Sequence, residues 1–237
     1  MLSIVWTVRG VAADGGVRLL FAAGALFVLA VVAAKSQGLD PSRVTRDLAT
    51  LCHSHPLDGA LSSLGVLGWI ATAAICIGSG VLTWHILRRG AGFLIAAGAL
   101  SLLLGLDDLF QFHESIARSQ FGLHELAVYQ AIGAATLLFL WCFRQPILDG
   151  APGWLLCALG LLAASVALDT VFERWIEGYG AWAVLAEDGL KWLGITCWLR
   201  YFAGQAADVL AAAGLGRVRR EPSIWGLVTP RDGSVTA

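Results

Sequence analysis

Charged residues are scarce in this chain of 237 residues, and their scarcity argues against a water-soluble globular protein. Asp, Glu, Lys and Arg make up 14% of the sequence, whereas hydrophobic residues make up 57%. About a quarter of the residues of a soluble domain are normally charged, so this composition lies outside the soluble norm. A water-soluble core cannot bury that much apolar surface. The net charge is only −1, so no global field favours binding to nucleic acid.

Sequence motifs of several common enzyme classes are also missing. The chain contains no P-loop, GxGxxG, GxSxG or HExxH pattern, so nucleotide binding, serine-hydrolase chemistry and zincin proteolysis have no motif support. Four of the five cysteines fall in apolar runs, and Cys52 alone lies in a polar segment. We therefore expect no disulfide framework.

The sequence contains instead six long apolar runs. A helix needs about 20 apolar residues to cross a membrane, because each residue adds about 1.5 Å and lipid offers the backbone no hydrogen bonds. Six runs meet this requirement, at residues 17–34, 61–87, 92–112, 124–143, 154–172 and 181–202. The later connections are short, which predicts antiparallel neighbours. We predict an all-α integral membrane protein, with a six-transmembrane-helix up-and-down bundle over residues 1–210 and a cytoplasmic tail over residues 211–237.

The placement of charge predicts the orientation of this bundle. Basic residues near the ends of spans are retained in the cytoplasm, and ten of the sixteen lie inside if both termini are cytoplasmic. Twelve of the seventeen Asp and Glu residues then fall in the outer half, although insertion rules place no such demand on acidic residues. We therefore expect that a function at the outer end of the bundle requires negative charge.

Four predicted helix ends carry this outer charge, in the segments LLLGLDDLFQFHESI, FGLHELAVYQ, SVALDTVFERW and LAEDGLKWL. An ionisable residue within a span costs about 2.5–3.5 kcal/mol on insertion scales, so such residues are functional candidates by default. On an ideal helix Asp107 and Glu114 share one face, because they are seven residues apart. The candidate catalytic residues are Asp107, Asp169, Glu187, Asp188 and Lys191.

The same segments also contain a candidate metal site. Carboxylates and imidazoles from facing helices are the ligands of carboxylate-bridged metal centres. The candidate ligands are Asp108, His113, Glu114, His124, Glu125 and Glu173. They predict a divalent Fe, Zn or Mn ion. Two alternatives stay open: an interfacial network in which Arg118, Arg174 and Lys191 neutralise the acids, and a proton or cation pathway.

Residues 102–114, LLLGLDDLFQFHE, resemble a segment of uncharacterised bacterial multi-pass membrane proteins. The resemblance covers a small part of the chain and implies no particular activity. We expect the protein in a bacterial inner membrane. The leading hypothesis is a protein whose outer-facing pocket binds a divalent metal and acts, as a hydrolase or oxidoreductase, on a lipid-like or other membrane-borne substrate. A proton- or cation-coupled transporter is the second hypothesis, and a non-catalytic subunit of a membrane complex is the third. The lipid bilayer is the expected partner.

Overall fold

The computed structural model describes residues 21, 23–40, 51–55, 57–112, 116–122, 124–170 and 181–215. All regular secondary structure in these residues is helical, which confirms the predicted all-α class for this part of the chain. The chain divides into two compact units, residues 1–58 and 59–237. In the first unit, the described helix Ala23–Ser36 is apolar and overlaps the predicted first span.

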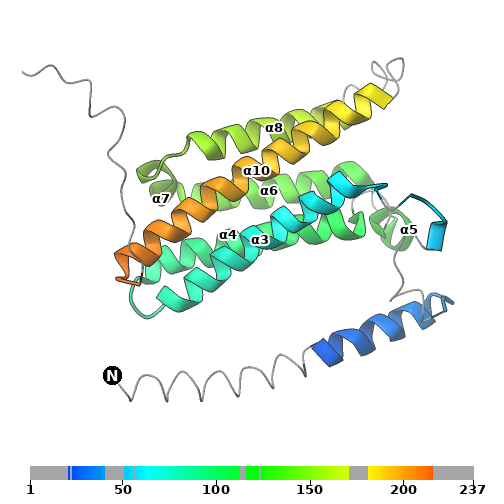
Figure 1. Ribbon diagram of the computed structural model, residues 1–237, viewed down its shortest axis with the longest axis horizontal. Coiled ribbons are helices and arrows are strands. Elements are labelled where there is room, and N and C mark those ends of the chain that lie inside the picture. The colour runs from blue at the N-terminus through cyan, green and yellow to red at the C-terminus, as the bar shows by residue number, and fades with distance from the viewer. Residues whose placement is uncertain are drawn as a thin grey trace, which may run out of the picture. The chain divides into compact units, whose positions relative to one another are not determined.

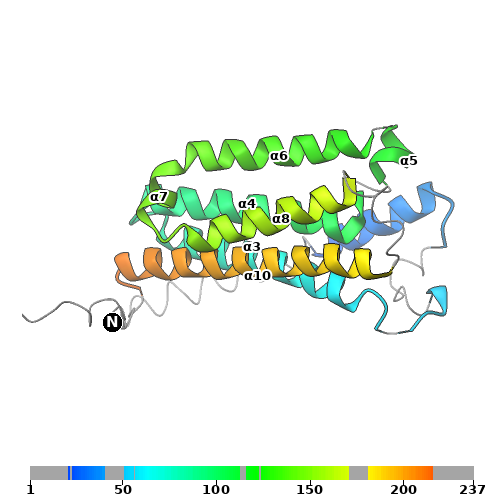
Figure 2. The same ribbon diagram turned by 90° about the horizontal axis from the view of Figure 1, so that it is seen from above.

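The described part of the second unit contains five long helices and two short ones. In Figure 1 the long helices run side by side and successive ones alternate in direction, and Figure 2 shows the same arrangement from above. The helices are α3 (Ala60–Thr83), α4 (Arg88–Phe110), α5 (Ala117–Phe121), α6 (Glu125–Cys142), α7 (Arg144–Asp149), α8 (Gly153–Thr170) and α10 (Ala181–Ala212). This alternation is the up-and-down connectivity that the short connections predict.

Three of these helices, α3, α4 and α6, are each long and apolar enough to cross a membrane. They correspond to the predicted spans 61–87, 92–112 and 124–143. The helices Ala23–Ser36 and Gly153–Asp169 are apolar but shorter. The last helix, α10, continues ten residues beyond the predicted end of the sixth span and reaches Ala212.

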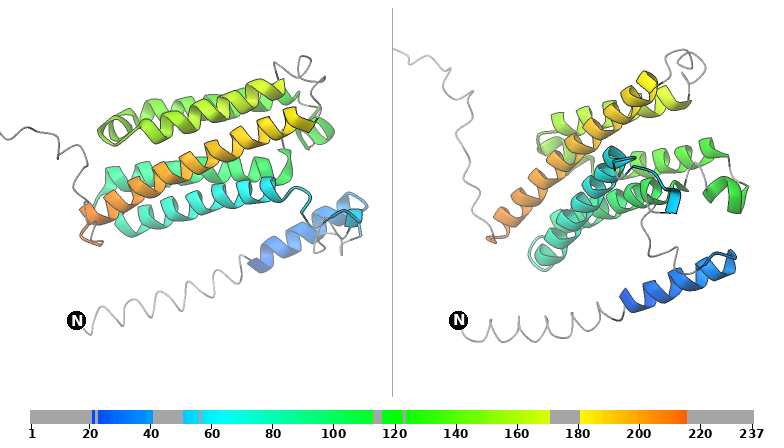
Figure 3. Two further views of the ribbon diagram at one scale, coloured as in Figure 1. Left: turned by 45° about the horizontal axis from the view of Figure 1, so that its top comes forward. Right: turned by 45° about the vertical axis from the view of Figure 1, so that its right-hand side comes forward.

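Close helix packing determines how the ends of the second unit are arranged. Helix α10 packs against both α3 and α8, and α3 packs along α4, as can be followed in Figure 3. Glycines make the α3–α4 contact possible: a Cβ on Gly80 would lie 2.9 Å from the Ala91 carbonyl oxygen, and one on Gly98 would lie 3.0 Å from the Ala73 carbonyl oxygen. Small residues at such positions let helix backbones approach closely.

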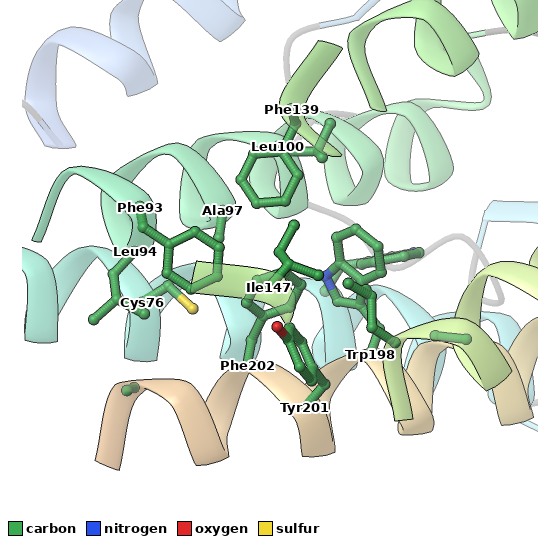
Figure 4. Packing of buried hydrophobic residues seen from close by; sticks show 14 of the residues in the cluster. Cys76, Phe93, Leu94, Ala97, Leu100, Phe139, Ile147, Trp198, Tyr201 and Phe202 are labelled. Carbon is green, nitrogen blue, oxygen red and sulfur yellow. The ribbon is translucent and has the colours of Figure 1, made fainter. Parts of the chain in front are cut away.

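An aromatic cluster fills the middle of the bundle (Figure 4). Phe93 of α4 stacks on Phe139 of α6 with ring centroids 5.9 Å apart. On α10, Trp198 and Phe202 are 1% and 0% exposed, and their rings lie 4.8 Å apart. Interleaved large rings of this kind cannot shift past one another without opening cavities. The cluster therefore holds α4, α6 and α10 in a fixed register.

Candidate functional site

An ion pair between two helices forms the centre of the candidate site. The ammonium Nζ of Lys191 on α10 lies 2.7 Å from Oδ1 of Asp108 on α4. The indole Nε1 of Trp69 on α3 donates a hydrogen bond of 2.8 Å to the other oxygen, Asp108 Oδ2. Three helices therefore meet at one carboxylate, and both of its oxygens are engaged.

Glycines and a tryptophan pair explain why the three helices meet so closely here. A Cβ on Gly105 of α4 would lie 2.9 Å from the Trp69 Cβ, and one on Gly68 of α3 would lie 2.7 Å from a side-chain atom of α10. Trp69 is 2% exposed, and its ring packs edge-on against Trp198 with centroids 5.7 Å apart. This packing fixes the indole, so its N–H stays directed at Asp108.

The two partners of the ion pair differ in their access to the surroundings. The Asp108 side chain is 10% exposed and the Lys191 side chain is 35% exposed. The accessible part of Lys191 lines a small cavity of about 20 Å³, together with Ser62, Asp188 and Trp192. That volume accommodates about one water molecule. The site therefore presents a cation to the cavity and holds its counterion inside the bundle.

Further carboxylates act on the same ammonium. Asp107 and Asp188 both interact electrostatically with Lys191. Asp107 is buried on α4, whereas Asp188 is exposed on α10, one turn before the lysine. Glu187, also on α10, is half-buried. The structure thus brings four of the predicted residues, Asp107, Asp108, Asp188 and Lys191, into one electrostatic group.

A second polar contact joins α6 to α8. The Tyr129 hydroxyl donates a hydrogen bond of 2.9 Å to Asp169 Oδ2. The Glu125 carboxylate is also close enough to act electrostatically on that hydroxyl. Two of the predicted residues, Glu125 and Asp169, are therefore associated through a tyrosine that the sequence analysis did not select.

The family to which the chain belongs follows from a comparison of sequences. A family model described as a domain of unknown function (DUF8692) matches residues 19–204. The chain belongs to this family. The DUF8692 match spans the helices from α3 to α8 and most of α10, and thus includes Trp69, Asp108 and Lys191. No curated protein and no solved structure matches the chain.

The described residues of this DUF8692 protein give no support to the predicted metal centre. His113, Glu114 and Glu173 lie outside the described residues. Within the described ranges, no three His, Cys, Asp or Glu side chains are grouped so that they could hold a metal ion. Asp108 accepts from Trp69 and Lys191, so a metal at this carboxylate would share it with an ammonium and an indole N–H.

Two helix ends in the DUF8692 protein bear on the predicted site residues. Helix α4 ends at Phe110, and Gln111 adopts a left-handed conformation with φ of 48°. The regular 3.6-residue spacing of α4 thus ends at Phe110, and because Glu114 lies outside the described residues, its place on the face of Asp107 stays a prediction. His124 caps α6, because its Nδ1 accepts a hydrogen bond of 3.3 Å from the Leu126 N–H, as polar side chains at helix starts commonly do.

Sequence reasoning missed Trp69 and Tyr129, which donate hydrogen bonds to the partly buried acids Asp108 and Asp169. A tryptophan or tyrosine within an apolar span satisfies its polar atom when buried, and this rule is the signal that was available. Trp69 lies in the first half of the span 61–87, and Tyr129 lies one turn after Glu125. Both positions are therefore at the same membrane level as the predicted acids, which can accept the hydrogen bond that each side chain needs to donate.

Proposed function

We propose that this DUF8692 protein is a multi-pass protein of the bacterial inner membrane that crosses the bilayer six times, with both termini in the cytoplasm. The three membrane-length helices α3, α4 and α6 support this proposal. The apolar helices Ala23–Ser36 and Gly153–Asp169, together with α10, would supply the other three crossings. In the alternating arrangement of Figure 1, Asp108, Asp169 and Lys191 then lie toward the outer surface.

The proposed function is acid–base chemistry at the outer end, on a membrane-borne molecule that reaches the cavity beside Lys191. One observation carries this proposal: Asp108 is held by Trp69 and is nearly buried, while Lys191 is 35% exposed at the cavity. A fixed counterion keeps the ammonium in place, and the accessible ammonium can give a proton to a group that enters; the neutral amine that remains can then take a proton back. A lysine differs in this respect from an arginine, which keeps its proton in proteins.

A site that works from one surface fits the structure better than a relay across the membrane. The polar links that lead inward from the site pass through tryptophan indoles, whose N–H groups only donate. Trp198 Nε1 donates to Ser101 Oγ, which in turn donates to the Ala97 carbonyl oxygen of its own helix. Among the described residues, these contacts provide no continuous path for a proton to the inner surface. Transport therefore remains the weaker hypothesis.

A matched pair of substitutions at Lys191 tests the proposed function. General acid–base catalysis contributes about 10²–10⁴-fold to a rate, so we expect Lys191→Arg and Lys191→Met each to lower turnover by at least about 100-fold. The assay is mass spectrometry of an inner-membrane lipid extract incubated with the purified protein in proteoliposomes. Asp208→Asn, which changes an exposed acid near the other end of α10, is the control and should leave turnover unchanged.

The outcomes of this assay separate three explanations. If Lys191→Arg turns over lipid as the wild type does, the site needs only a positive charge and the acid–base proposal fails. If the wild-type protein converts no lipid, the proposed enzymatic role fails. Elemental analysis of the same preparation tests the metal prediction, which now depends on His113, Glu114 and Glu173, because stoichiometric Fe, Zn or Mn would return the metal to the mechanism.

A further inference from the structure

A basic groove lies at the end of the bundle opposite Lys191. Arg88 and Arg89 begin α4, and Arg144 begins α7. In Figure 1 these two helix starts lie at the same end of the second unit, away from the start of α10. The three arginines line one open groove with a volume of about 620 Å³, together with Trp141 and Phe143. Pockets of about 300–1,000 Å³ are the size that binds small molecules.

The electrostatics of this groove favour an anion. No described acidic side chain forms an ion pair with Arg88, Arg89 or Arg144. The start of a helix carries partial positive charge, so cations in the first turn are unfavourable there and anions are favourable. Helix α4 nevertheless begins with two arginines, has no acidic residue in its first turn, and receives no side-chain cap from Leu87. An anion in the groove would relieve this concentration of positive charge.

The rule that retains basic residues in the cytoplasm does not account for the groove by itself. That rule depends on the number of Lys and Arg residues near the ends of spans, and it is satisfied wherever around the bundle they lie. It does not require arginines from α4 and α7 to line the same groove. The placement of all three arginines on one groove is therefore a separate observation, and it indicates a ligand with negative charge.

An exposed apolar surface continues from the groove along α6. Leu137, Leu138 and Trp141 are 67%, 63% and 70% exposed, and the guanidinium of Arg144 lies over the Trp141 ring, 4.7 Å from its centroid. A cation held over an aromatic ring at a membrane surface is well placed to meet a head group, while the ring contacts the acyl region. A ligand with an anionic head and an apolar tail matches both surfaces.

We propose that this groove binds the phosphate head group of an anionic membrane lipid, whose acyl chains lie along the exposed face of α6. Basic pockets between membrane helices bind such head groups because each guanidinium attracts the phosphate and the apolar chains need not leave the bilayer. The groove is distinct from the Lys191 site, and the inference does not depend on the proposed acid–base function.

The test is native mass spectrometry of the purified full-length chain, released from nanodiscs of phosphatidylcholine that contain either phosphatidylglycerol or cardiolipin as a minor component. We expect retained anionic lipid with the wild-type chain and none in nanodiscs of phosphatidylcholine alone. The triple variant Arg88→Gln/Arg89→Gln/Arg144→Gln is expected to bind the anionic lipid about 100-fold more weakly, because each basic residue contributes about fivefold. Arg118→Gln, on α5 at the opposite end, is the matched control and should bind as the wild type does.

Two further measurements keep the test decisive. The single variants Arg88→Gln and Arg144→Gln should each weaken binding about fivefold, and they provide the answer if the triple variant fails to fold. Inorganic phosphate is added as a competitor. The proposal would be overturned if both single variants retained as much anionic lipid as the wild type. It would also be overturned if Arg118→Gln lost as much lipid as the groove variants. Displacement of the lipid by millimolar inorganic phosphate would show that the groove takes a free phosphate, which would also overturn it.

Discussion

Replacing Asp108 by alanine is expected to lower the free energy of unfolding by about 3 kcal/mol. The substitution removes the carboxylate that lies 2.7 Å from Lys191 Nζ and accepts the Trp69 N–H. Removing one partner of a buried ion pair costs about 3–5 kcal/mol, because the remaining charge is left uncompensated. Lys191 is 35% exposed, so water reaches part of its ammonium and the lower end of that range applies.

The measurement is reversible unfolding of the purified protein in mixed micelles, followed by circular dichroism. The double variant Asp108→Asn/Lys191→Met is the informative companion, because it removes both charges and keeps an oxygen to accept the Trp69 N–H. Replacing both partners of a buried ion pair is often close to neutral, so we expect this variant to recover most of the lost stability. A double variant as unstable as Asp108→Ala would mean that loss of the ion pair does not explain the destabilisation.

Trp69→Ala is expected to destabilise the protein by about 3–5 kcal/mol, which is the usual cost of truncating a buried tryptophan. Trp69 is 2% exposed, packs against the ring of Trp198 and donates to Asp108. The substitution therefore leaves a cavity between α3 and α10 and also removes a donor from a buried carboxylate. Both effects follow from the loss of one side chain, so the total destabilisation of Trp69→Ala does not separate them.

Trp69→Phe separates the two contributions. Phenylalanine keeps an aromatic ring against Trp198 but cannot donate to Asp108, and we expect a loss of about 1–3 kcal/mol from the missing hydrogen bond. Trp84→Ala is the control, because Trp84 is 40% exposed at the end of α3 and its truncation should cost less than about 1 kcal/mol. The same unfolding assay applies. Equal stability of Trp69→Phe and the wild type would show that the hydrogen bond contributes nothing.

The helices were predictable where a single physical rule determines them. A membrane span needs a minimum apolar length, and this rule located α3, α4 and α6 with boundaries within a few residues of those observed. The rule failed at the end of α10, which continues from Phe202 to Ala212 through the segment AGQAADVLAA. That segment is less apolar, so a hydropathy criterion stops before it, although its alanines favour a helix.

The site was predictable as a set of acids at one level of the bundle, but its pairings were not. Alternating helices bring Asp108 and Lys191 to the same end, as expected from the short connections. Their contact depends on the rotation of α4 and α10 about their own axes, and that rotation is set by packing contacts such as those of Gly105 and Trp69. Hydropathy carries no information about this rotation. His124 illustrates a different limit, because the sequence pattern did not indicate that its side chain caps α6, and its role as a metal ligand stays a prediction.

Side-specific labelling tests the central claim most directly, namely that the Lys191 cavity and the arginine groove open on opposite sides of a membrane. Ser62 lines the cavity and native Cys142 lines the groove. Each chain tested keeps a single cysteine, and its other cysteines are replaced by serine. A membrane-impermeant maleimide is applied to intact spheroplasts that contain this chain. We expect Ser62→Cys, with Cys142 also replaced, to be labelled at once, and native Cys142 to be labelled only after the membrane is permeabilised. Labelling of both positions from the same side would contradict the account.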